Sequence, residues 1–471
     1  MKKRLVFVCC SIVTSLLIYL KLNRWGFVYV ESEVECVGSS LNQSSLFKNI
    51  FYFNKTFWIL TTKKSSLPLA NVRVGPWIPT KLIPERRRFY SQSQFIDFLR
   101  QNHLNPTYIR NVTIYFDQLW LSNIGHALFD GLYPAYLALI RFPPRHLRPF
   151  TILLSTIVDS TNTSFTYEVY RTFSGLEIRN FTEMEENSFQ RSFVFEELII
   201  GSGNMCQRCL QPDLQLPGGI HLNGSALFRQ RMYHKYNLTF NQKKKQTMNI
   251  LIIHNKRFTD DEKNELLQTI DEIHVRYPSI QIEYLDFQSN KSWTMKEHLE
   301  LISRTNIHVS GPGTGQMYQT FLSDGSVHIN LGAIHSRWNF TSFMEQYMAA
   351  GTPYIKAIYY PIQQRTQGIQ KEIVIQLIEQ ALQLIQQDFH IPVEPNFNLA
   401  PDGQLFVEMC SRDRLFCQTV THRWENQHFE CVNTWPEEII NEVGPWSTRN
   451  STCFINRTLL KQLKLKFNLL R

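Results

Sequence analysis

Short apolar runs alternate with amphipathic stretches through the middle of the chain. Runs rich in β-branched and apolar residues predict strands at 151–158, 195–201, 248–254, 280–287, 306–311 and 327–332. Apolar residues at helical spacing predict helices at 264–277, 295–305 and 372–389. Such strand–helix alternation is typical of an α/β fold with a parallel sheet and right-handed crossovers.

The extent of this alternation predicts two domains. It runs from about residue 89 to 390, and roughly 300 residues exceed the usual size of one domain. We therefore expect two Rossmann-like domains facing a cleft, at 89–245 and 246–390, with the polar stretch 241–249 as the linker. Residues 23–88 hold no convincing long periodic element and suit a stem and N-terminal extension. Residues 391–471 lose the alternation and gain cysteines, which predicts a disulfide-stapled C-terminal appendage.

The N-terminus predicts a signal anchor. A short basic tail, 1–4, precedes the uncharged run Leu5–Leu20, which as a helix would span about 24 Å against a hydrocarbon core of about 30 Å. We assign 5–22 to a single transmembrane helix with a cytosolic N-terminus and a lumenal body, a type II topology. A cleaved signal peptide is the alternative, but Lys21 and Arg24 stand where a small-residue cleavage site would be expected.

Glycosylation triplets support the lumenal placement. Eleven N-x-S/T triplets occur, where the composition predicts roughly four by chance, and each needs a lumenal chain and an exposed asparagine to be used. They begin at Asn42, Asn54, Asn111, Asn162, Asn180, Asn223, Asn237, Asn290, Asn339, Asn450 and Asn456. We therefore expect a glycoprotein of the secretory pathway.

Cysteines and charge fit the same compartment. Seven cysteines lie outside the apolar run, so in an oxidising lumen most should pair and one should remain. Cys206 and Cys209 could form a redox or half-zinc site, but no second CxxC pair has zinc-site spacing, which favours a local disulfide. The net charge of +9 is modest for this length, and its densest runs, 86–88 and 243–245, suit either solvated faces or an anionic substrate. Nucleic acid is not an expected partner in the lumen.

The stretch SGPGTGQMYQTFLSDGSVHINLG, residues 310–332, reads as strand, glycine-rich turn, helix and strand. Gly311, Gly313 and Gly315 let the backbone approach a ligand, and the helix start at Thr314 presents N–H groups that suit a diphosphate. The pattern is neither GxGxxG nor a P-loop. Tight packing within the fold is the alternative use of these glycines.

A second candidate segment leaves the predicted strand 248–254. It delivers Asn255, Lys256 and Arg257 at the carboxyl end of the strand, where open α/β sheets bind ligands. The two cations could neutralise phosphate, the arginine through its bidentate fork. A solvated basic loop is the alternative.

The third candidate is LSNIGHALFDGLYP, residues 121–134, where His126 and Asp130 fall on one helix face. The pair could deprotonate a hydroxyl group, with Asp130 orienting the imidazole or acting as the base, and Asn123 one turn earlier could hold a sugar hydroxyl. A satisfied core histidine is the alternative. Because burial of an unpaired carboxylate is costly, this polar trio is more easily explained at the border of a cleft.

On these residues the sequence resembles glycosyltransferase family 61, the group with the DUF563 domain. The N-x-x-H-x-x-x-D stretch of the family looks like Asn123, His126 and Asp130, and its strand with an Arg-containing loop looks like LIIHNKR, with Asn264 a looser match. Its G-x-H-G-A-G segment is similar to VSGPGTGQMYQTFLSDGSVHI, where six positions match: Gly313, Gly315, Phe321, Leu322, Gly325 and Val327. The chain departs at Pro312, where the family usually has His, and at Thr314, where it has Ala. The similarity covers roughly 110–345.

The resemblance implies a GT-B architecture and an inverting transfer of sugar from a nucleotide-sugar, such as UDP-GlcNAc or UDP-xylose, to a hydroxyl of a glycoprotein or glycan. Donor binding would fall to 246–345, with Arg257 on the diphosphate. No D-x-D triplet is present, so we expect no metal and no cofactor besides the nucleotide-sugar co-substrate. The expected location is the Golgi or endoplasmic reticulum membrane. An inactive relative that binds glycan or protein is the alternative, because Pro312 lacks both an imidazole and a backbone donor. A hydrolase is not supported, since neither G-x-S-x-G nor H-E-x-x-H occurs.

Overall fold

The computed structural model describes the central part of the chain, with gaps. The described residues are 31–37, 44–62, 72–73, 81–82, 84–102, 104, 106–118, 121–155, 164–186, 192–201, 215–216, 220–221, 224–239, 247–287, 293–335, 340–342, 352 and 354–387. The predicted anchor, the appendage, every cysteine except Cys36 and seven of the eleven sequon asparagines lie outside them: Asn42, Asn162, Asn223, Asn290, Asn339, Asn450 and Asn456.

An eight-stranded mixed sheet forms the N-terminal part. Its order is β6-β3-β2-β10-β7-β8-β9, with β1 added beside β2. Pairs between β10, β7, β8 and β9 are parallel, as is the pair of β3 with β6, whereas β2 runs antiparallel to β1, β3 and β10. The strands are β1 (Glu33–Val37), β2 (Ser44–Phe53), β3 (Thr56–Thr61), β6 (Glu85–Arg88), β7 (Thr107–Phe116), β8 (Phe150–Leu154), β9 (Gly175–Asn180) and β10 (Phe193–Ile200). The expected α/β class is confirmed, but this sheet is mixed, not wholly parallel.

Four of these strands come from residues 23–88, which the sequence analysis read as a stem and extension. The strand β2, SSLFKNIFYF, is buried at nine of its ten positions because both faces of the sheet are covered. Phe47 and Ile50 belong to one core cluster, and Leu46 to another. A strand buried on both faces carries no apolar–polar alternation, so the periodicity gave no sign of it.

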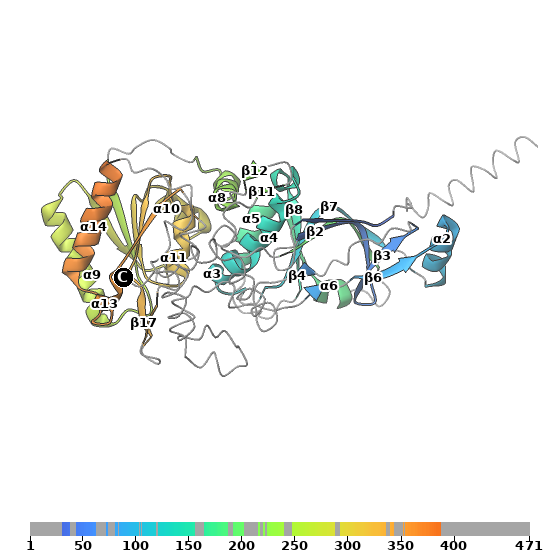
Figure 1. The fold of residues 1–471 in the computed structure, drawn as a ribbon, viewed down its shortest axis with the longest axis horizontal. Coiled ribbons are helices and arrows are strands. Elements are labelled where there is room, and N and C mark those ends of the chain that lie inside the picture. The colour runs from blue at the N-terminus through green and yellow to red at the C-terminus, as the bar shows by residue number, and fades with distance from the viewer. Residues whose placement is uncertain are drawn as a thin grey trace, which may run out of the picture.

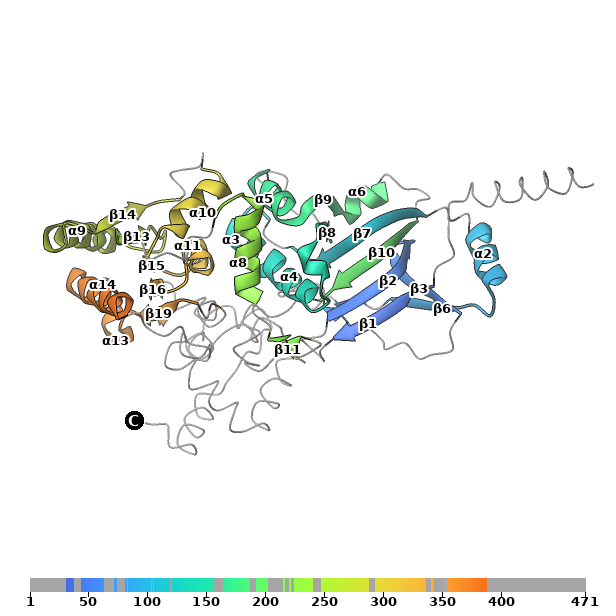
Figure 2. The ribbon, with the colours of Figure 1, turned by 90° about the horizontal axis from the view of Figure 1, so that it is seen from above.

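Helices pack on the N-terminal sheet and connect it to the C-terminal part of the molecule (Figures 1 and 2). They are α2 (Gln92–Gln101), α3 (Ile124–His126), a π-helical turn (Ala127–Leu132), α4 (Tyr133–Ile140), α5 (Ser164–Ser174), α6 (Phe181–Glu186) and α8 (Gly224–Lys235). The chain from α3 to α4 is one continuous helical run, as predicted for 121–134, and all eight residues of α4 are buried.

A five-stranded parallel sheet forms the C-terminal part, in the order β14-β13-β15-β16-β19. Its strands are β13 (Asn249–Ile253), β14 (Gln281–Leu285), β15 (Ile307–Ser310), β16 (Val327–Asn330) and β19 (Lys356–Tyr359). The six strands predicted from sequence correspond to β8, β10, β13, β14, β15 and β16. This all-parallel sheet is compatible with a Rossmann-like fold.

Helices cover both faces of this second sheet. The helices are α9 (Asp260–Arg276), α10 (Met295–Ser303), α11 (Thr314–Met317), a 3-10 turn (Tyr318–Phe321), α13 (Ile362–Arg365) and α14 (Lys371–Gln386). Side chains of α9 and α14 share one core cluster with the sheet, and those of α10 and of 314–322 share another. The predicted helices at 264–277, 295–305 and 372–389 are confirmed as α9, α10 and α14.

The two sheets are joined by one continuous core in the middle of the elongated molecule (Figure 2). The Phe129 and Phe321 ring centroids lie 6.1 Å apart. From α8, Arg229 bonds Asp324 at 2.6 Å, and the Tyr233 hydroxyl donates to the Phe321 carbonyl at 2.8 Å. The contacts made by α8 and by these rings therefore pack the two α/β units directly against each other.

Three minor sheets complete the described structure. They are the two-stranded pairs β4–β5 (Val72–Arg73 and Lys81–Leu82), β11–β12 (Gln215–Leu216 and Ile220–His221) and β17–β18 (Ala333–His335 and Phe340–Ser342). Among the described residues Cys36 forms no disulfide, and its Sγ lies 3.3 Å from the Ser45 hydroxyl. Within the described ranges no helix has the length and apolarity to cross a membrane.

Candidate functional site

Two of the predicted segments meet at the topological switch point of the parallel sheet. The chain passes from β13 to β14 on one side, whereas β15, β16 and β19 lie on the other, so the strand order reverses between β13 and β15. Ligands of open α/β sheets bind beyond the carboxyl ends of strands at such a point. Here those ends lead into the loop 254–259 and the glycine turn 311–315.

Arg257 lies against the glycine turn. The Asn255 side-chain oxygen accepts the backbone N–H of Arg257 at 3.0 Å, which folds the loop back toward the sheet. Asn255 Nδ2 and Arg257 Nη1 both donate to the Pro312 carbonyl, at 2.6 and 2.7 Å. Asn255 is buried and Arg257 is half-buried, whereas Lys256 is exposed. The predicted juxtaposition of guanidinium and glycine turn is therefore present.

The three glycines of the turn serve different purposes. A Cβ on Gly311 would lie 2.7 Å from the Phe258 ring, and one on Gly315 would lie 2.8 Å from Ile253 Cγ2, so both positions are glycine because of packing within the fold. Gly313 has φ +116° and ψ −159°, a conformation that is essentially restricted to glycine, and its Cβ would lie 2.9 Å from Arg257 Nη1. Gly313 is thus the glycine at which the backbone faces the guanidinium.

The helix after the turn is shorter than expected. α11 has four residues and passes directly into a 3-10 turn. A single turn adds few aligned peptide dipoles, so a helix macrodipole contributes little here. Positive potential at the turn comes mainly from the Arg257 guanidinium, which contacts the Pro312 carbonyl.

The third predicted segment reaches the same turn from the other sheet. Thr314 Oγ1 donates to Asn123 Oδ1 at 3.1 Å, although the two residues are 191 positions apart. Asn123 Oδ1 also accepts the Gly125 N–H at 3.0 Å and so caps α3. A Cβ on Gly125 would lie 2.7 Å from both Thr314 Oγ1 and Met317 Sδ. Gly125 therefore permits the close approach of α3 and α11, a role that the sequence analysis missed although a glycine inside a helical pattern signals such packing.

His126 and Asp130 are paired. The His126 Nδ1 atom bonds Asp130 Oδ2, and the Asp130 side chain is 5% exposed while the His126 side chain is 35% exposed. Asp130 lies in the π-helical turn, in which the Tyr133 N–H donates to the Leu128 carbonyl five residues earlier. A buried carboxylate on Nδ1 fixes the imidazole orientation and directs Nε2 away from it, which is the arrangement of a general base.

Tyr170 and Gln118 support this turn. The Tyr170 hydroxyl lies 2.6 Å from the Ala127 carbonyl and 2.7 Å from Gln118 Oε1. Burial first, and then the nearby Asp130 carboxylate, raise the pKa of Tyr170 well above 10, so the phenol stays protonated. Single π-turns inside α-helices occur frequently at functional sites.

A pair of buried histidines lies on β15 and β16, the two strands that the glycine-turn segment connects. His308 and His328 are opposite each other on β15 and β16, with their Nδ1 atoms 2.8 Å apart, and both are fully buried. Burial lowers the pKa of His328 to about 3 and holds the pKa of His308 well below 6.5. Both imidazoles are therefore neutral near pH 7.

Two further residues of the region were missed. His254, directly after β13, is half-buried, and its Nδ1 lies 2.8 Å from the Tyr284 hydroxyl. His298 on α10 contacts the Tyr318 hydroxyl at 2.8 Å, and burial lowers its pKa to about 4. His254 could have been found, because it stands at the end of a predicted strand beside Asn255.

The described sequon asparagines differ in exposure. Asn54, Asn111 and Asn237 are exposed, whereas Asn180 is 3% exposed in β9 and lacks the accessible side chain on which its predicted glycosylation depends. The three exposed asparagines have φ of 48°, 70° and 54°, a left-handed conformation in which asparagine is enriched among residues other than glycine.

No group of three or more His, Cys, Asp or Glu side chains suited to a metal ion occurs within the described ranges. Comparison of the sequence with profiles of known protein families gives no match, and comparison with curated proteins gives none either.

Proposed function

We propose that the protein is an inverting, metal-independent glycosyltransferase of GT-B type that is anchored in a membrane of the secretory pathway. It transfers a sugar from a nucleotide-sugar, in the first instance a UDP-sugar, to a hydroxyl of a glycoprotein or glycan. The contact between Thr314 and Asn123 carries the proposal, because it brings the helix of His126 and Asp130 to the glycine turn that Arg257 also contacts.

In this proposal the C-terminal sheet holds the donor. The diphosphate lies over the turn at Gly313, where Arg257 offers charge. A guanidinium has five N–H donors, and the bond to the Pro312 carbonyl uses one of them. Charge that develops on the leaving diphosphate is stabilised by this guanidinium and by backbone N–H groups of the turn.

The helix run from α3 supplies the base. His126, oriented by Asp130, removes the proton of the acceptor hydroxyl as that oxygen attacks the anomeric carbon from the side opposite the diphosphate. The anomeric carbon–phosphate oxygen bond breaks, and the configuration at that carbon inverts.

A binding module without activity is the second candidate, and the bonding of Pro312 favours it. The Pro312 carbonyl engages both Asn255 and Arg257, so two predicted donor-binding groups are satisfied within the protein itself. In that case the lumenal domain binds glycan and no nucleotide.

A transfer assay separates the two candidates. The purified lumenal chain is incubated with a panel of nucleotide-sugars and glycan acceptors, with and without EDTA, and nucleotide release and product mass are measured. The proposal predicts release from one nucleotide class that EDTA leaves unchanged. Stabilisation by free glycan, with no nucleotide bound or released, would support the binding module instead.

A further inference from the structure

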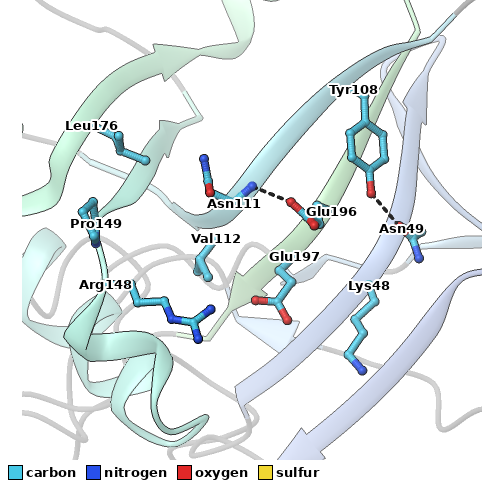
Figure 3. A pocket seen from close by; sticks show the side chains of 10 residues that line it. All are labelled: Lys48, Asn49, Tyr108, Asn111, Val112, Arg148, Pro149, Leu176, Glu196 and Glu197. Carbon is cyan, nitrogen blue, oxygen red and sulfur yellow. Dashed lines mark hydrogen bonds between the residues drawn. The ribbon is translucent and has the colours of Figure 1, made fainter. Parts of the chain in front are cut away.

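A groove of about 680 Å³ opens on the N-terminal sheet, away from the site described above (Figure 3). It lies over β2, β7 and β10, and residues at the starts of β8 and β9 close its side. Its volume falls within the range of about 300–1,000 Å³ that is usual for small-ligand sites. Asn111, the first residue of a predicted sequon, is one of its lining residues.

A local irregularity of the sheet presents Asn111 to this groove. The register of β10 and β7 shifts between Phe195 and Glu197, so that Ile109 and Val112 are successive partners on β7. Asn111 has φ +70° at this bulge, and its backbone N–H donates to Glu196 Oε2 at 2.7 Å. Bulges re-aim side chains, and Figure 3 shows the Asn111 carboxamide extending toward Leu176 and Pro149.

The walls of the groove suit a neutral, polyhydroxylated ligand. Tyr108 is 41% exposed, and its hydroxyl is held 3.1 Å from Asn49 Oδ1, so its ring offers a face against which a sugar ring can pack. The charged lining residues are Lys48, Arg148, Glu196 and Glu197, and two of them already have partners outside the groove lining: Lys48 pairs with Glu33, and Glu197 with Arg145. A strongly charged ligand of either sign would meet like charge here, whereas sugar hydroxyls can both donate to and accept from these groups.

We infer that the groove holds the first sugar residues of an N-linked glycan carried by Asn111 itself. In the attachment step, Asn111 Nδ2 bonds to the anomeric carbon of an oligosaccharide linked to a lipid diphosphate. The bond between that carbon and the phosphate oxygen breaks, the lipid diphosphate leaves, and a carboxamide proton passes to the attaching enzyme. The inference depends on entry of the chain into the lumen and not on transferase activity.

The neighbouring residues provide a clean variant set. Thr113, which completes the sequon, is fully buried, and its hydroxyl has no hydrogen-bond partner among the described residues. Thr113→Val therefore removes the sequon with little change in the core, and Thr113→Ser retains it. Asn54 and Asn237 are exposed sequon asparagines that do not line the groove, and they serve as internal controls.

The full chain is produced in a eukaryotic secretory system, and site occupancy is measured by peptide mass spectrometry. An endoglycosidase that cleaves between the first two sugars is then applied to the folded protein. We expect cleavage at Asn111 at least about tenfold slower than at Asn54 or Asn237, and Tyr108→Ala should remove this protection without changing occupancy. Relative to Thr113→Ser, Thr113→Val should have a lower Tm in the glycosylated preparations than it has when both variants are made without glycan, a comparison that removes the effect of the core change itself.

Two outcomes would overturn the inference. They are an unmodified Asn111 in a chain that is glycosylated elsewhere, and equal cleavage rates at the three asparagines. Nucleotide binding is measured on the same preparations, so failure of the glycan inference is distinguishable from failure of the proposed transferase function.

Discussion

Gly313 is the residue at which backbone geometry and the proposed donor site coincide. Its neighbours Gly311 and Gly315 are required by Phe258 and Ile253, so the glycine spacing by itself reports packing. Only Gly313 combines a conformation that side chains disfavour with a direct approach to the Arg257 guanidinium.

The variant Gly313→Ala should therefore lose donor binding as well as stability. We expect a loss of about 1–3 kcal/mol in unfolding free energy from backbone strain, and a nucleotide affinity lowered at least about tenfold because the new Cβ displaces Arg257. Gly325→Ala is the matched control, since Gly325 has φ +79° with open space around its Cβ position. Equal nucleotide affinity in the two variants would contradict this role of Gly313.

His126 and Asp130 should be needed for transfer but not for nucleotide binding. Asp130→Asn keeps the shape of the side chain but removes the charge that orients and stabilises the imidazole, and we expect a fall in turnover of about 10³-fold or more, as for the equivalent change in a Ser-His-Asp triad. His126→Ala should fall at least as far. Nucleotide affinity, measured by calorimetry, should stay within about twofold for both variants. Loss of folding in both would return the pair to a structural role.

Sequon asparagines show why a motif count is an incomplete guide. Asn54, Asn111 and Asn237 adopt the left-handed backbone conformation, which explains an asparagine at each position without reference to glycosylation. Asn180 lies in the core, and no feature of its triplet distinguishes it from the others. Exposure is set by the tertiary fold and cannot be read from three residues.

At the scale of elements, β13 to β16 and the helices α9, α10 and α14 were predicted from the sequence, whereas β19 and α13 were not. α9 and α10 each begin with a capping box, at Thr259–Glu262 and Thr294–Glu297. The strands β13, β15 and β16 are short runs rich in β-branched and apolar residues that end at polar or glycine-containing turns. The strands β1, β2 and β3 have no comparable signal in the sequence. β2 is covered on both faces, and because the three strands pair antiparallel, no helix separates them along the chain.

The buried ion pair of α13 with α9 should be a main determinant of this region's stability. Arg365 is fully buried, donates from Nε to the Leu331 carbonyl at 2.8 Å, and bonds Glu262, whose other oxygen caps α9. Arg365→Met should cost about 3–5 kcal/mol in chemical denaturation, because it leaves the Glu262 charge buried without its partner.

The exposed pair of Lys263 with Asp260 is the control for this prediction. Asp260 is 94% exposed, and Lys263→Ala should change the unfolding free energy by less than about 1 kcal/mol. A cost for Arg365→Met no larger than this would show that the buried pair is not important.

At the scale of the whole molecule, three buried histidines should make stability fall in acid. Burial lowers the pKa of His298 to about 4 and of His328 to about 3, and lowers that of His308 well below 6.5. The unfolded chain therefore binds more protons than the folded chain below pH 6.5. Their contribution is fully present above that pH and is lost as the pH falls toward 4 and below.

Each such histidine adds a slope of up to about 1.4 kcal/mol per pH unit to the unfolding free energy. We expect His298→Gln to flatten the dependence between pH 6 and 4.5 by roughly this amount, measured by denaturation at several pH values. An unchanged slope in His298→Gln would contradict the account of a neutral buried imidazole.

Periodicity and composition could not predict that the three candidate segments lie next to one another. Each segment could be recognised separately: a helix with His126 and Asp130 on one face, a basic loop and a glycine turn. The contact between Asn123 and Thr314 joins the N-cap of α3 to the first residue of α11 and depends on how these two helices pack through Gly125. The sequence resemblance named the same residues, but their distances follow only from the assembled fold.

Nucleotide binding by the protein with and without the Arg257 side chain tests the proposed donor site most directly. Calorimetry with UDP and UDP-GlcNAc is performed on the wild type, Arg257→Ala and Arg304→Ala. The last variant removes an exposed arginine that precedes the amino end of β15, opposite the carboxyl end where the proposed site lies. We predict binding to the wild type and to Arg304→Ala, and an affinity lowered about 30-fold or more in Arg257→Ala, which corresponds to about 2 kcal/mol for a charge-assisted bond. Equal affinity in all three proteins would contradict the proposed donor site.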